Sequence, residues 1–354
     1  MMKAIFPATL CLLFAGATAF EGEYVETVAL PPLPEPVSNN AVVSVRIAER
    51  EFVVSFAGLG AGRAHADITA ATYVFDGLDE RWTTAGPLPG GVGRLAAVAA
   101  AAGELVYVFG GYTVAKDGTE ISTSWVHSFD PLTGSFAQRQ PMPVPVDDAV
   151  AVTYDGRFIY LISGWHDLGN VNLVQRYDTE TDSWIQATPT PGRGVFGGAG
   201  GIVANTIVYC DGVAIEPHAN RRRDFVASNE CFAGLIDDSN PRRIDWRTVP
   251  PHPGLPRYRM AAAGIGESNA VVFVGGSDNP YNYDGIGYNG EPSQPIVEIL
   301  RYDLANQSWT TLISDAAGSM DHRGLVRFRG TWLTVGGMRK DQQVTDQVVA
   351  YSFK

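Results

Sequence analysis

Short apolar segments recur along the chain, separated by turns rich in glycine and proline, a pattern typical of β-strands. One unit repeats: an apolar strand, a second strand that ends in a small residue and a glycine, a loop, and a third strand that ends in an aspartate. An aromatic residue then opens a fourth strand. The second glycines are Gly58, Gly111, Gly164, Gly212, Gly276 and Gly337, at steps of 53, 53, 48, 64 and 61 residues. This period predicts six copies of one strand-rich unit.

The markers of this unit resemble those of the kelch repeat, and the resemblance covers essentially the whole chain after its first residues. The aromatic residues that open the fourth strands are Trp82, Phe136, Trp184, Trp246 and Trp309. Kelch repeats form the blades of β-propellers, because a four-stranded blade buries both faces only by stacking against neighbours around an axis. The resemblance implies that each Trp fills the wedge between two blades and that its indole N–H needs a partner there.

The sixth unit lacks a fourth strand, because the chain ends at Lys354 directly after its third strand. Residues 24–30, followed by Pro32-Leu33-Pro34, match the fourth strand and the Pro-x-Pro exit of other units. Pairing this segment beside the last strand would close the ring and remove an open edge. We predict an all-β, six-bladed kelch-type β-propeller over residues 20–354, closed by an N-terminal strand. Seven blades require a different division of the long fourth or fifth unit.

Composition narrows the partners of this chain. Its 354 residues carry 26 Lys and Arg against 38 Asp and Glu, a formal net charge of −12. Nucleic acids and anionic membranes attract a positive surface, so we expect neither as a partner. The 39 glycines and 22 prolines favour turns over long helices, in agreement with the all-β prediction.

The N-terminus has the pattern of a secretory signal over residues 1–19. Lys3 precedes a mostly apolar stretch, and Ala17-Thr18-Ala19 fits the small-x-small cleavage rule. A membrane anchor needs about 20 apolar residues, which Gly16 and Thr18 interrupt, and Leu10 is the wrong context for lipidation of Cys11. We therefore expect an exported protein, periplasmic or secreted, with no membrane span.

Cys210 and Cys231 are the two cysteines that remain after the signal. In an oxidising compartment such a pair indicates a disulfide. The repeat places one at the end of the second strand of blade four and the other at the start of its third strand, on adjacent antiparallel strands. Metal ligation or a catalytic thiol is the alternative, but the histidines have no metal-site spacing, and we expect no cofactor.

The residues that open the first strands include four arginines. In order they are Asn40, Arg94, Asp148, Arg193, Arg259 and Arg323. First strands line the central channel of a propeller, so the arginines are expected to converge on one face and to bind a carboxylate or phosphate. In the alternative interpretation, each arginine pairs with an aspartate or a loop carbonyl of a neighbouring blade.

The loops between second and third strands lie on the same predicted face. His166 belongs to blade three, Glu216 and His218 belong to blade four, and Tyr281 and Tyr283 belong to the long loop of blade five at 278–290. Tyrosines among Asn, Asp and Gly make a surface that suits stacking on sugar rings. The alternative is a loop that packs its own tyrosines. No nucleophile, phosphate-loop or dinucleotide motif appears in its required context.

Among kelch propellers, the chain is most similar to the periplasmic sialic acid mutarotases (N-acetylneuraminate epimerases). The similarity is clearest from Gly264-Ile265 through Val274-Gly275-Gly276 and the long Tyr- and Asn-rich loop that follows, and again in the blade of Arg323. It implies an isomerase that shuttles protons at the anomeric centre, with Glu216 or His218 as acid–base groups and the four arginines as a carboxylate clamp. In that family a Glu directly follows the glycine of the matching repeat, whereas Val213 follows Gly212 here.

Two other functions fit the same fold. Galactose-oxidase-like copper chemistry is disfavoured, because it needs a Tyr–Cys cross-link and paired histidines, and neither cysteine has such neighbours in the sequence. A non-catalytic module that binds a peptide, a protein partner or a glycan on the loop face fits as well as the enzyme, because propellers host both. The sequence therefore predicts a small anionic sugar or a peptide as the ligand and leaves catalysis open.

Overall fold

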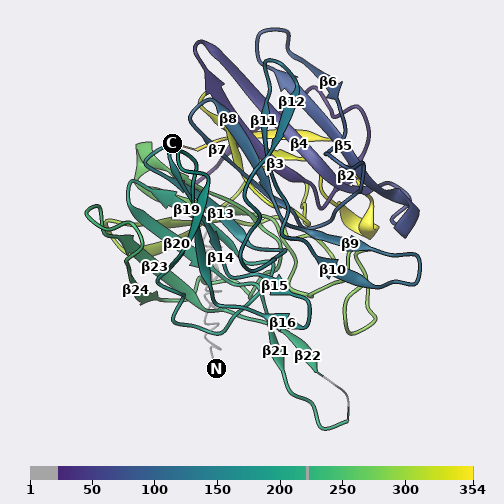
Figure 1. The fold of residues 1–354 in the computed structure, drawn as a ribbon. Coiled ribbons are helices and arrows are strands. Elements are labelled where there is room, and N and C mark those ends of the chain that lie inside the picture. Colours follow the sequence, from purple (N-terminus) through teal and green to yellow (C-terminus); the bar gives the residue numbers. More distant parts are fainter. Residues whose placement is uncertain (1–22, 221–222, 354) are drawn as a thin grey trace, which may run out of the picture.

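Six four-stranded blades surround a central axis in the computed structural model, which describes residues 23–220 and 223–353 (Figure 1). All pairings within the blades are antiparallel, and the sheets agree with the predicted all-β propeller. The expected signal, residues 1–19, lies outside the described residues. No helix in the described part of the chain is long and apolar enough to cross a membrane.

Each blade runs from a first strand near the axis to a fourth strand at the outside. Blade one contains β3 (Ala41–Ile47), β4 (Arg50–Gly60), β5 (Ile68–Asp76) and β6 (Arg81–Ala85), with β2 (Val37–Ser38) paired to the end of β4. Blade two contains β7 (Val98–Ala102), β8 (Leu105–Phe109), β11 (Val126–Asp130) and β12 (Ser135–Gln138). Blade three contains β13 (Val150–Tyr154), β14 (Phe158–Ile162), β17 (Val174–Asp178) and β18 (Ser183–Ala187). Blade four contains β19 (Ala199–Val203), β20 (Thr206–Cys210), β23 (Cys231–Ile236) and β24 (Ile244–Val249). Blade five contains β25 (Ala261–Ile265), β26 (Ala270–Val274), β27 (Ile299–Asp303) and β28 (Ser308–Leu312).

Blade six closes the ring with both ends of the chain. It contains β29 (Val326–Phe328), β30 (Thr331–Val335), β31 (Val348–Ser352) and, as its fourth strand, β1 (Glu26–Leu30). The register runs from Glu26 opposite Ser352 to Leu30 opposite Val348. The predicted closure is therefore confirmed, and β31 has no open edge. The described residues also contain short 3-10 turns at His65–Asp67, Gly266–Ser268 and Lys340–Gln342.

The second glycine of each pair lies where a first strand approaches closely. A Cβ atom on Gly111 would lie 2.6 Å from the carbonyl oxygen of Leu95, and the φ of Gly111 is +82°. Both facts require glycine there. Directly after it, Tyr112 pairs with Leu95, and the same pairing recurs in other blades, for example Val213 with Phe196. The glycine pairs therefore tie the start of each first strand to the end of the second.

The fourth-strand tryptophans link successive blades, as expected, although they are half-buried rather than fully buried. Each indole N–H donates to the carbonyl that precedes the Pro-x-Pro exit of the previous blade. The pairs are Trp82 with Pro31, Trp184 with Gln140, Trp246 with Thr188 and Trp309 with Pro250, at 2.7–3.1 Å. Blade two has Phe136 instead, which packs on Phe56 and Phe129 and has no N–H to donate. Four junctions are thus held by the same side chain-to-backbone bond.

Candidate functional site

Three hairpins and one long loop rise from one end of the ring, which we call the loop face. The hairpins are β9–β10 (Tyr112–Val114 and Glu120–Ser122), β15–β16 (Trp165–His166 and Gly169–Asn170) and β21–β22 (Val213–Glu216 and Asp224–Ala227). Figure 1 shows them on the same side of the molecule. They are the loops between the second and third strands of blades two, three and four, and residues 277–296 form the corresponding loop of blade five. The sequence placed these loops on one face correctly.

A ring of backbone hydrogen bonds surrounds the axis beneath the loop face. Its members occupy equivalent positions with φ between +50° and +68°: Asn39, Ala96, Asp148, Gly197, Arg259 and Asp321. The backbone N–H groups of Asp148, Gly197 and Arg259 each donate to the ring carbonyl of the preceding blade at 2.9–3.0 Å. The left-handed conformation is uncommon for residues other than glycine, so the packing of the surrounding blades must impose it at these positions.

Ring side chains and Arg323 form a buried charged group, which we call the axial cluster. It contains Asn39, Asp148, Arg259, Asp321 and Arg323. Arg259 donates to Asp148 at 2.6 Å and to Asp321 at 3.0 Å, while Arg323 lies 2.8 Å from Asp148 and 3.6 Å from Asp321. These four charged side chains are at most 3% exposed. Burial acts to raise the pKa of Asp148, but the guanidinium groups of Arg259 and Arg323 outweigh it and hold this pKa below its usual value.

The four arginines do not converge on the axis as the sequence predicted. Arg259 and Arg323 do, but Arg94 lies in blade two, where it donates to the carbonyl of Gly110 at 2.8 Å and faces the ring of Trp125. Burial lowers the pKa of Arg94 to about 10. Arg193 is exposed and pairs with Glu216 at 3.0 Å. Of the four, only Arg259 occupies a ring position, so pairing with aspartates and carbonyls describes these arginines better than an open clamp.

A cavity of about 140 Å³, the inner pocket, opens above the axial cluster on the loop face. Its aromatic walls come from blades two to five: Tyr112, Trp165, Phe196, Phe225 and Tyr288. Its polar lining consists of Glu120, Ser122, Asp147, Asp148, Arg223, Arg259 and Asn282. The pocket therefore combines ring faces with several hydrogen-bonding groups, as small-ligand sites do.

Asp147 is the buried acid of this pocket. Its side chain accepts a hydrogen bond of 2.6 Å from the Ser122 hydroxyl, and the residue is 4% exposed. Burial, reinforced by the negative charge of Asp148, raises the pKa of Asp147 well above its usual value. Glu120 lies at the rim. Desolvation of its carboxyl group by the surrounding protein raises its pKa, although the residue as a whole is exposed. The pocket thus contains a buried carboxyl group whose pKa is raised above its ordinary value.

Arg223 joins two of the hairpins over the inner pocket. Its guanidinium carbon lies 4.8 Å from the ring centre of Trp165 and 5.4 Å from that of Phe225. It also donates to the carbonyl of Leu168, in the turn of β15–β16, at 2.6 Å. Phe225 in turn stacks on Tyr288 from the blade-five loop, with ring centres 4.2 Å apart. The aromatic walls are therefore braced against one another.

The predicted acid–base and aromatic residues lie mostly outside this pocket. Glu216 pairs with Arg193 on the outer part of β21–β22, and His218 lies exposed beyond it, with Nε2 3.9 Å from Asp224. Neither lines the inner pocket. His166 donates from Nδ1 to the carbonyl of Pro145 at 2.8 Å and does not line it either.

The two predicted tyrosines of the blade-five loop also pack inward. Tyr281 is fully buried and packs edge-on against Tyr258, with ring centres 4.9 Å apart. Tyr283 is partly buried and packs against the same hydrophobic cluster, which contains Tyr258 and Tyr281. Tyr288 is the tyrosine of this loop that lines the inner pocket. The loop thus packs two of its three tyrosines itself and presents the third.

Sequence reasoning missed Asp147, Glu120 and Phe225. Asp147 precedes the strand-opening Asp148, so two adjacent acids at a first strand were a readable signal. Glu120 and Phe225 had none, because each lies in a hairpin whose length differs from those of the other blades.

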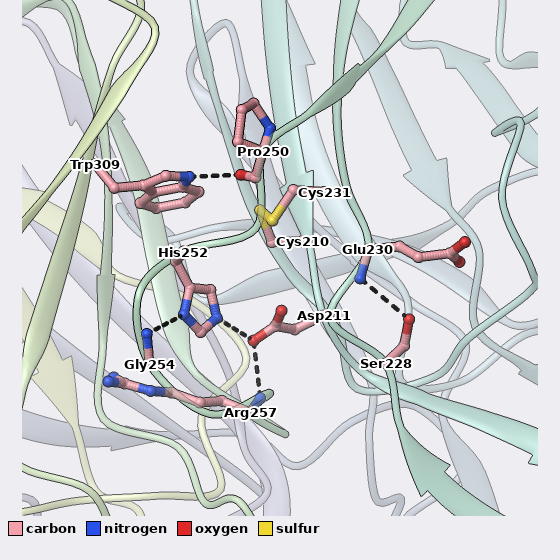
Figure 2. The surroundings of a disulfide bond; sticks show 10 residues. All are labelled: Cys210, Asp211, Ser228, Glu230, Cys231, Pro250, His252, Gly254, Arg257 and Trp309. Atoms are coloured by element: carbon pink, nitrogen blue, oxygen red, sulfur yellow. Dashed lines mark hydrogen bonds and ion pairs between the residues drawn. A yellow bond between two sulfur atoms is a disulfide. The ribbon is translucent and has the colours of Figure 1, made fainter.

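The base of the β21–β22 hairpin is fixed by the predicted disulfide. Cys210 and Cys231 face each other in register on β20 and β23 and are bonded (Figure 2). The next residue, Asp211, is buried and accepts hydrogen bonds from His252 Nε2 and from the backbone N–H of Arg257, each at 2.8 Å. The hairpin that carries Arg223 and Phe225 therefore rises from a covalently closed, buried base.

The axial cluster separates the inner pocket from a second cavity. That cavity, about 230 Å³, lies in the central channel and is lined by the first strands, with Asp148 shared between the two. No group of three or more His, Cys, Asp or Glu side chains placed to hold a metal ion occurs within 23–220 and 223–353.

Comparisons with known proteins agree with this architecture. The kelch motif family model matches residues 93–143. Beta-scruin of Limulus polyphemus is 27% identical over 175 residues, which are 48% of this chain and 18% of scruin. Kelch-like protein terF of Aspergillus terreus is 24% identical over 222 residues, 60% of this chain and 43% of terF. These matches span less than half of the length of either relative.

Two longer matches cover most of the chain. Kelch domain-containing protein 3 of Bos taurus is 22% identical over 313 residues, 84% of this chain and 75% of that protein. The solved structure of YjhT has a TM-score of 0.70 and 17% identity, covering 92% of this chain and 97% of YjhT. At that identity the likeness supports the fold alone. The chain is therefore a closed six-bladed β-propeller with one matched kelch motif, and it is similar to kelch-repeat proteins.

Proposed function

We propose that this protein binds a carbohydrate in the inner pocket of the loop face. The observation that carries the proposal is the set of aromatic walls from four blades around buried and rim carboxyl groups. Aromatic faces stack on the C–H faces of sugar rings, while carboxylates and amides accept hydrogen bonds from sugar hydroxyls. The volume of about 140 Å³ lies below the 300–1,000 Å³ typical of drug-sized ligands, which suits a single ring.

The charges of the site favour a neutral sugar over an anionic one. The guanidinium groups of Arg259 and Arg323 are paired with Asp148 and Asp321. An anionic ligand that pairs with Arg259 or Arg323 would have to replace one of these buried partners, at a cost of several kcal/mol. The carboxylate clamp expected from the resemblance to sialic acid mutarotases therefore has less support than neutral sugar binding.

Calorimetric titration with neutral and acidic monosaccharides tests the proposal. We expect saturable binding of at least one neutral sugar, weakened about tenfold or more by Tyr288→Ala, because the stacking face is removed. The matched control is Glu216→Ala, because Glu216 lies on the loop face but does not line the pocket. If no sugar binds while peptides do, the peptide-binding alternative replaces this proposal.

A sugar isomerase is a second candidate, and the buried Asp147 favours it. Opening a pyranose requires a base that takes the proton of the anomeric hydroxyl and an acid that protonates the ring oxygen as the C1–O bond breaks. Closure on the other face reverses these transfers and gives the other anomer. Asp147, with its raised pKa, suits the acid, and the rim Glu120 suits the base.

Anomer exchange measured by NMR distinguishes the two assignments of the acid. Asp147→Asn should abolish exchange and Glu216→Gln should leave it unchanged if Asp147 is the acid. The opposite pattern would support Glu216, as the family resemblance implied. If the wild-type protein binds the sugar without accelerating exchange, the protein is a binding module.

We also propose that the protein is exported. The disulfide between Cys210 and Cys231 supports this, because such bonds persist in oxidising compartments. Cell fractionation of the full chain against a variant lacking residues 1–19 tests it. Export of both forms, or of neither, would contradict the assignment of the signal.

A further inference from the structure

A second hollow, the outer groove, continues from the inner pocket across the loop face. It has a volume of about 380 Å³ and lies between the β21–β22 hairpin and the blade-five loop, lined on its outer side by Val226, Pro280 and Asn289. It shares Arg223, Phe225 and Tyr288 with the inner pocket. Two binding spaces therefore meet at one set of side chains.

The shared aromatic side chains form a stacked pair between the two spaces. The rings of Phe225 and Tyr288 stack with an interplanar angle of 27°. Tyr288 is 39% exposed and Val226, next to Phe225, is 37% exposed, so apolar surface faces solvent along the groove. Aromatic rings contact sugar rings through the surface that they leave exposed, and here that surface lines both spaces.

The blade-five wall of the groove is held in place before any ligand arrives. The backbone N–H of Tyr288 donates to the carbonyl of Pro280 at 3.0 Å, and the hydroxyl of Ser293 donates to the carbonyl of Asn279 at 2.7 Å. The Asn279 amide also donates to the carbonyl of Glu291 at 3.1 Å. A preformed wall lowers the conformational entropy lost on binding.

The charges along the outer groove also indicate the kind of chain that it accepts. Among its described lining residues, Arg223 and Asp224 are the charged groups, and they have opposite signs. The remaining polar lining residues are Asn279, Asn289 and Tyr288. Such a surface matches hydroxyl groups better than it matches a row of carboxylates or sulfates.

We infer that the ligand is a linear neutral oligosaccharide, with a terminal sugar in the inner pocket and the following sugars running past the stacked Phe225–Tyr288 pair into the outer groove. This inference rests on the proposed carbohydrate binding and names the substrate class of that site. Together the two spaces reach the size range of ordinary ligand sites.

The experiment compares each monosaccharide with its tetrasaccharide by calorimetric titration. The panel holds glucose with cellotetraose, N-acetylglucosamine with chitotetraose, and galacturonic acid with tetragalacturonate. For a neutral pair we expect the tetrasaccharide to bind about three- to tenfold more tightly than the monosaccharide, the gain of one stacked ring.

Val226→Trp fills the outer groove without touching the inner pocket, so it should remove this gain and leave monosaccharide binding unchanged. The matched control is Val297→Trp, at a valine that is 56% exposed and lines neither space. Circular dichroism and the melting temperature establish that both variants are folded.

The outcomes separate this inference from the proposed function. Equal affinities for monosaccharide and tetrasaccharide, or a gain that Val226→Trp does not remove, overturn the inference and leave monosaccharide binding intact. A gain only for tetragalacturonate overturns the neutral class. Absence of binding across the panel overturns the proposed function itself.

Discussion

Replacing Arg259 by Ala tests whether the axial cluster holds the ring together or is an open anion site. Arg259 is 2% exposed at its side chain and contacts Asp148 and Asp321, which lie on two other blades. Its guanidinium also lies 4.5 Å from the ring centre of Tyr258. Removing one partner of a buried ion pair leaves an uncompensated charge, which typically costs about 3–5 kcal/mol.

The expected change in melting temperature follows from the size of the domain. Unfolding entropy of about 2 cal/mol/K per residue gives roughly 0.7 kcal/mol per degree for a chain of this size, so 3–5 kcal/mol corresponds to about 4–7 °C. Scanning calorimetry of the variant measures the shift directly. Arg193→Ala, which breaks the exposed pair with Glu216, is the control and should change stability by less than about 1 kcal/mol.

The pH dependence gives an independent check of the same argument. In the wild type the pKa of Asp148 is depressed, so its stabilising contribution is present at neutral pH and is lost as the pH falls through its folded value. In Arg259→Ala that pKa rises, and protonation relieves the unpaired charge. The deficit in stability should therefore shrink between pH 7 and pH 4. A melting temperature within 1 °C of wild type, combined with loss of ligand binding, would refute the structural role.

Three further predictions concern Asp147, the disulfide and the interblade indoles. Burial raises the pKa of Asp147, so folding takes up a proton and the stability falls as the pH rises above about 4. The melting temperature of Asp147→Asn should therefore be higher than that of the wild type at pH 8 and equal to it at pH 4. Melting temperatures that differ by the same amount at every pH would contradict this. Replacing Cys210 and Cys231 by Ala should lower the free energy of unfolding by about 3 kcal/mol in denaturant titrations, because the bond closes a segment with a sequence separation of 21; no change on adding a reductant to the wild type would argue against it. Trp309→Phe should lower stability by about 0.5–1.5 kcal/mol through loss of the 2.7 Å bond to the Pro250 carbonyl, and a loss above 3 kcal/mol would mean that packing, not this bond, dominates.

The sequence predicted the fold well because the repeated residues have direct roles in packing and bonding the backbone. Glycines such as Gly111 mark close approaches that exclude a side chain, and tryptophans such as Trp309 mark the interblade bond. The closing strand was readable as well, because its Pro-x-Pro exit accepts the same indole bond, here from Trp82 to Pro31. Features of this kind recur once per blade and reinforce one another.

The prediction that all four arginines lie on the axis was wrong because the connection from the exit proline to the axial ring varies in length between blades. From the exit proline to the axial ring the chain takes five residues in one case, Pro143 to Asp148, and seven in another, Pro89 to Ala96. A count of five residues from Pro89 reaches Arg94, whereas Ala96 occupies the ring position in blade two. The pairing in the structure identifies the ring instead, because the residue after the second glycine pairs with the residue before the ring position.

The inner pocket could not be derived because it is assembled from loops that differ in every blade. The hairpins of blades three and four meet over the pocket only through contacts such as Arg223 on Trp165, which no local pattern encodes. The raised pKa of Asp147 likewise depends on burial and on a neighbouring charge, which appear only in three dimensions.

The missing indole in blade two has a mechanical consequence for the ring. Four neighbouring pairs of blades are fastened by a tryptophan hydrogen bond, and the blade five–six junction has instead the backbone bond from Val25 to the Ile313 carbonyl at 2.8 Å. At the seam between blades one and two, Phe136 supplies ring packing without such a bond. Amide protons of β12 should therefore exchange with solvent before those of the other outer strands, and pulling the chain apart should open the propeller at this seam.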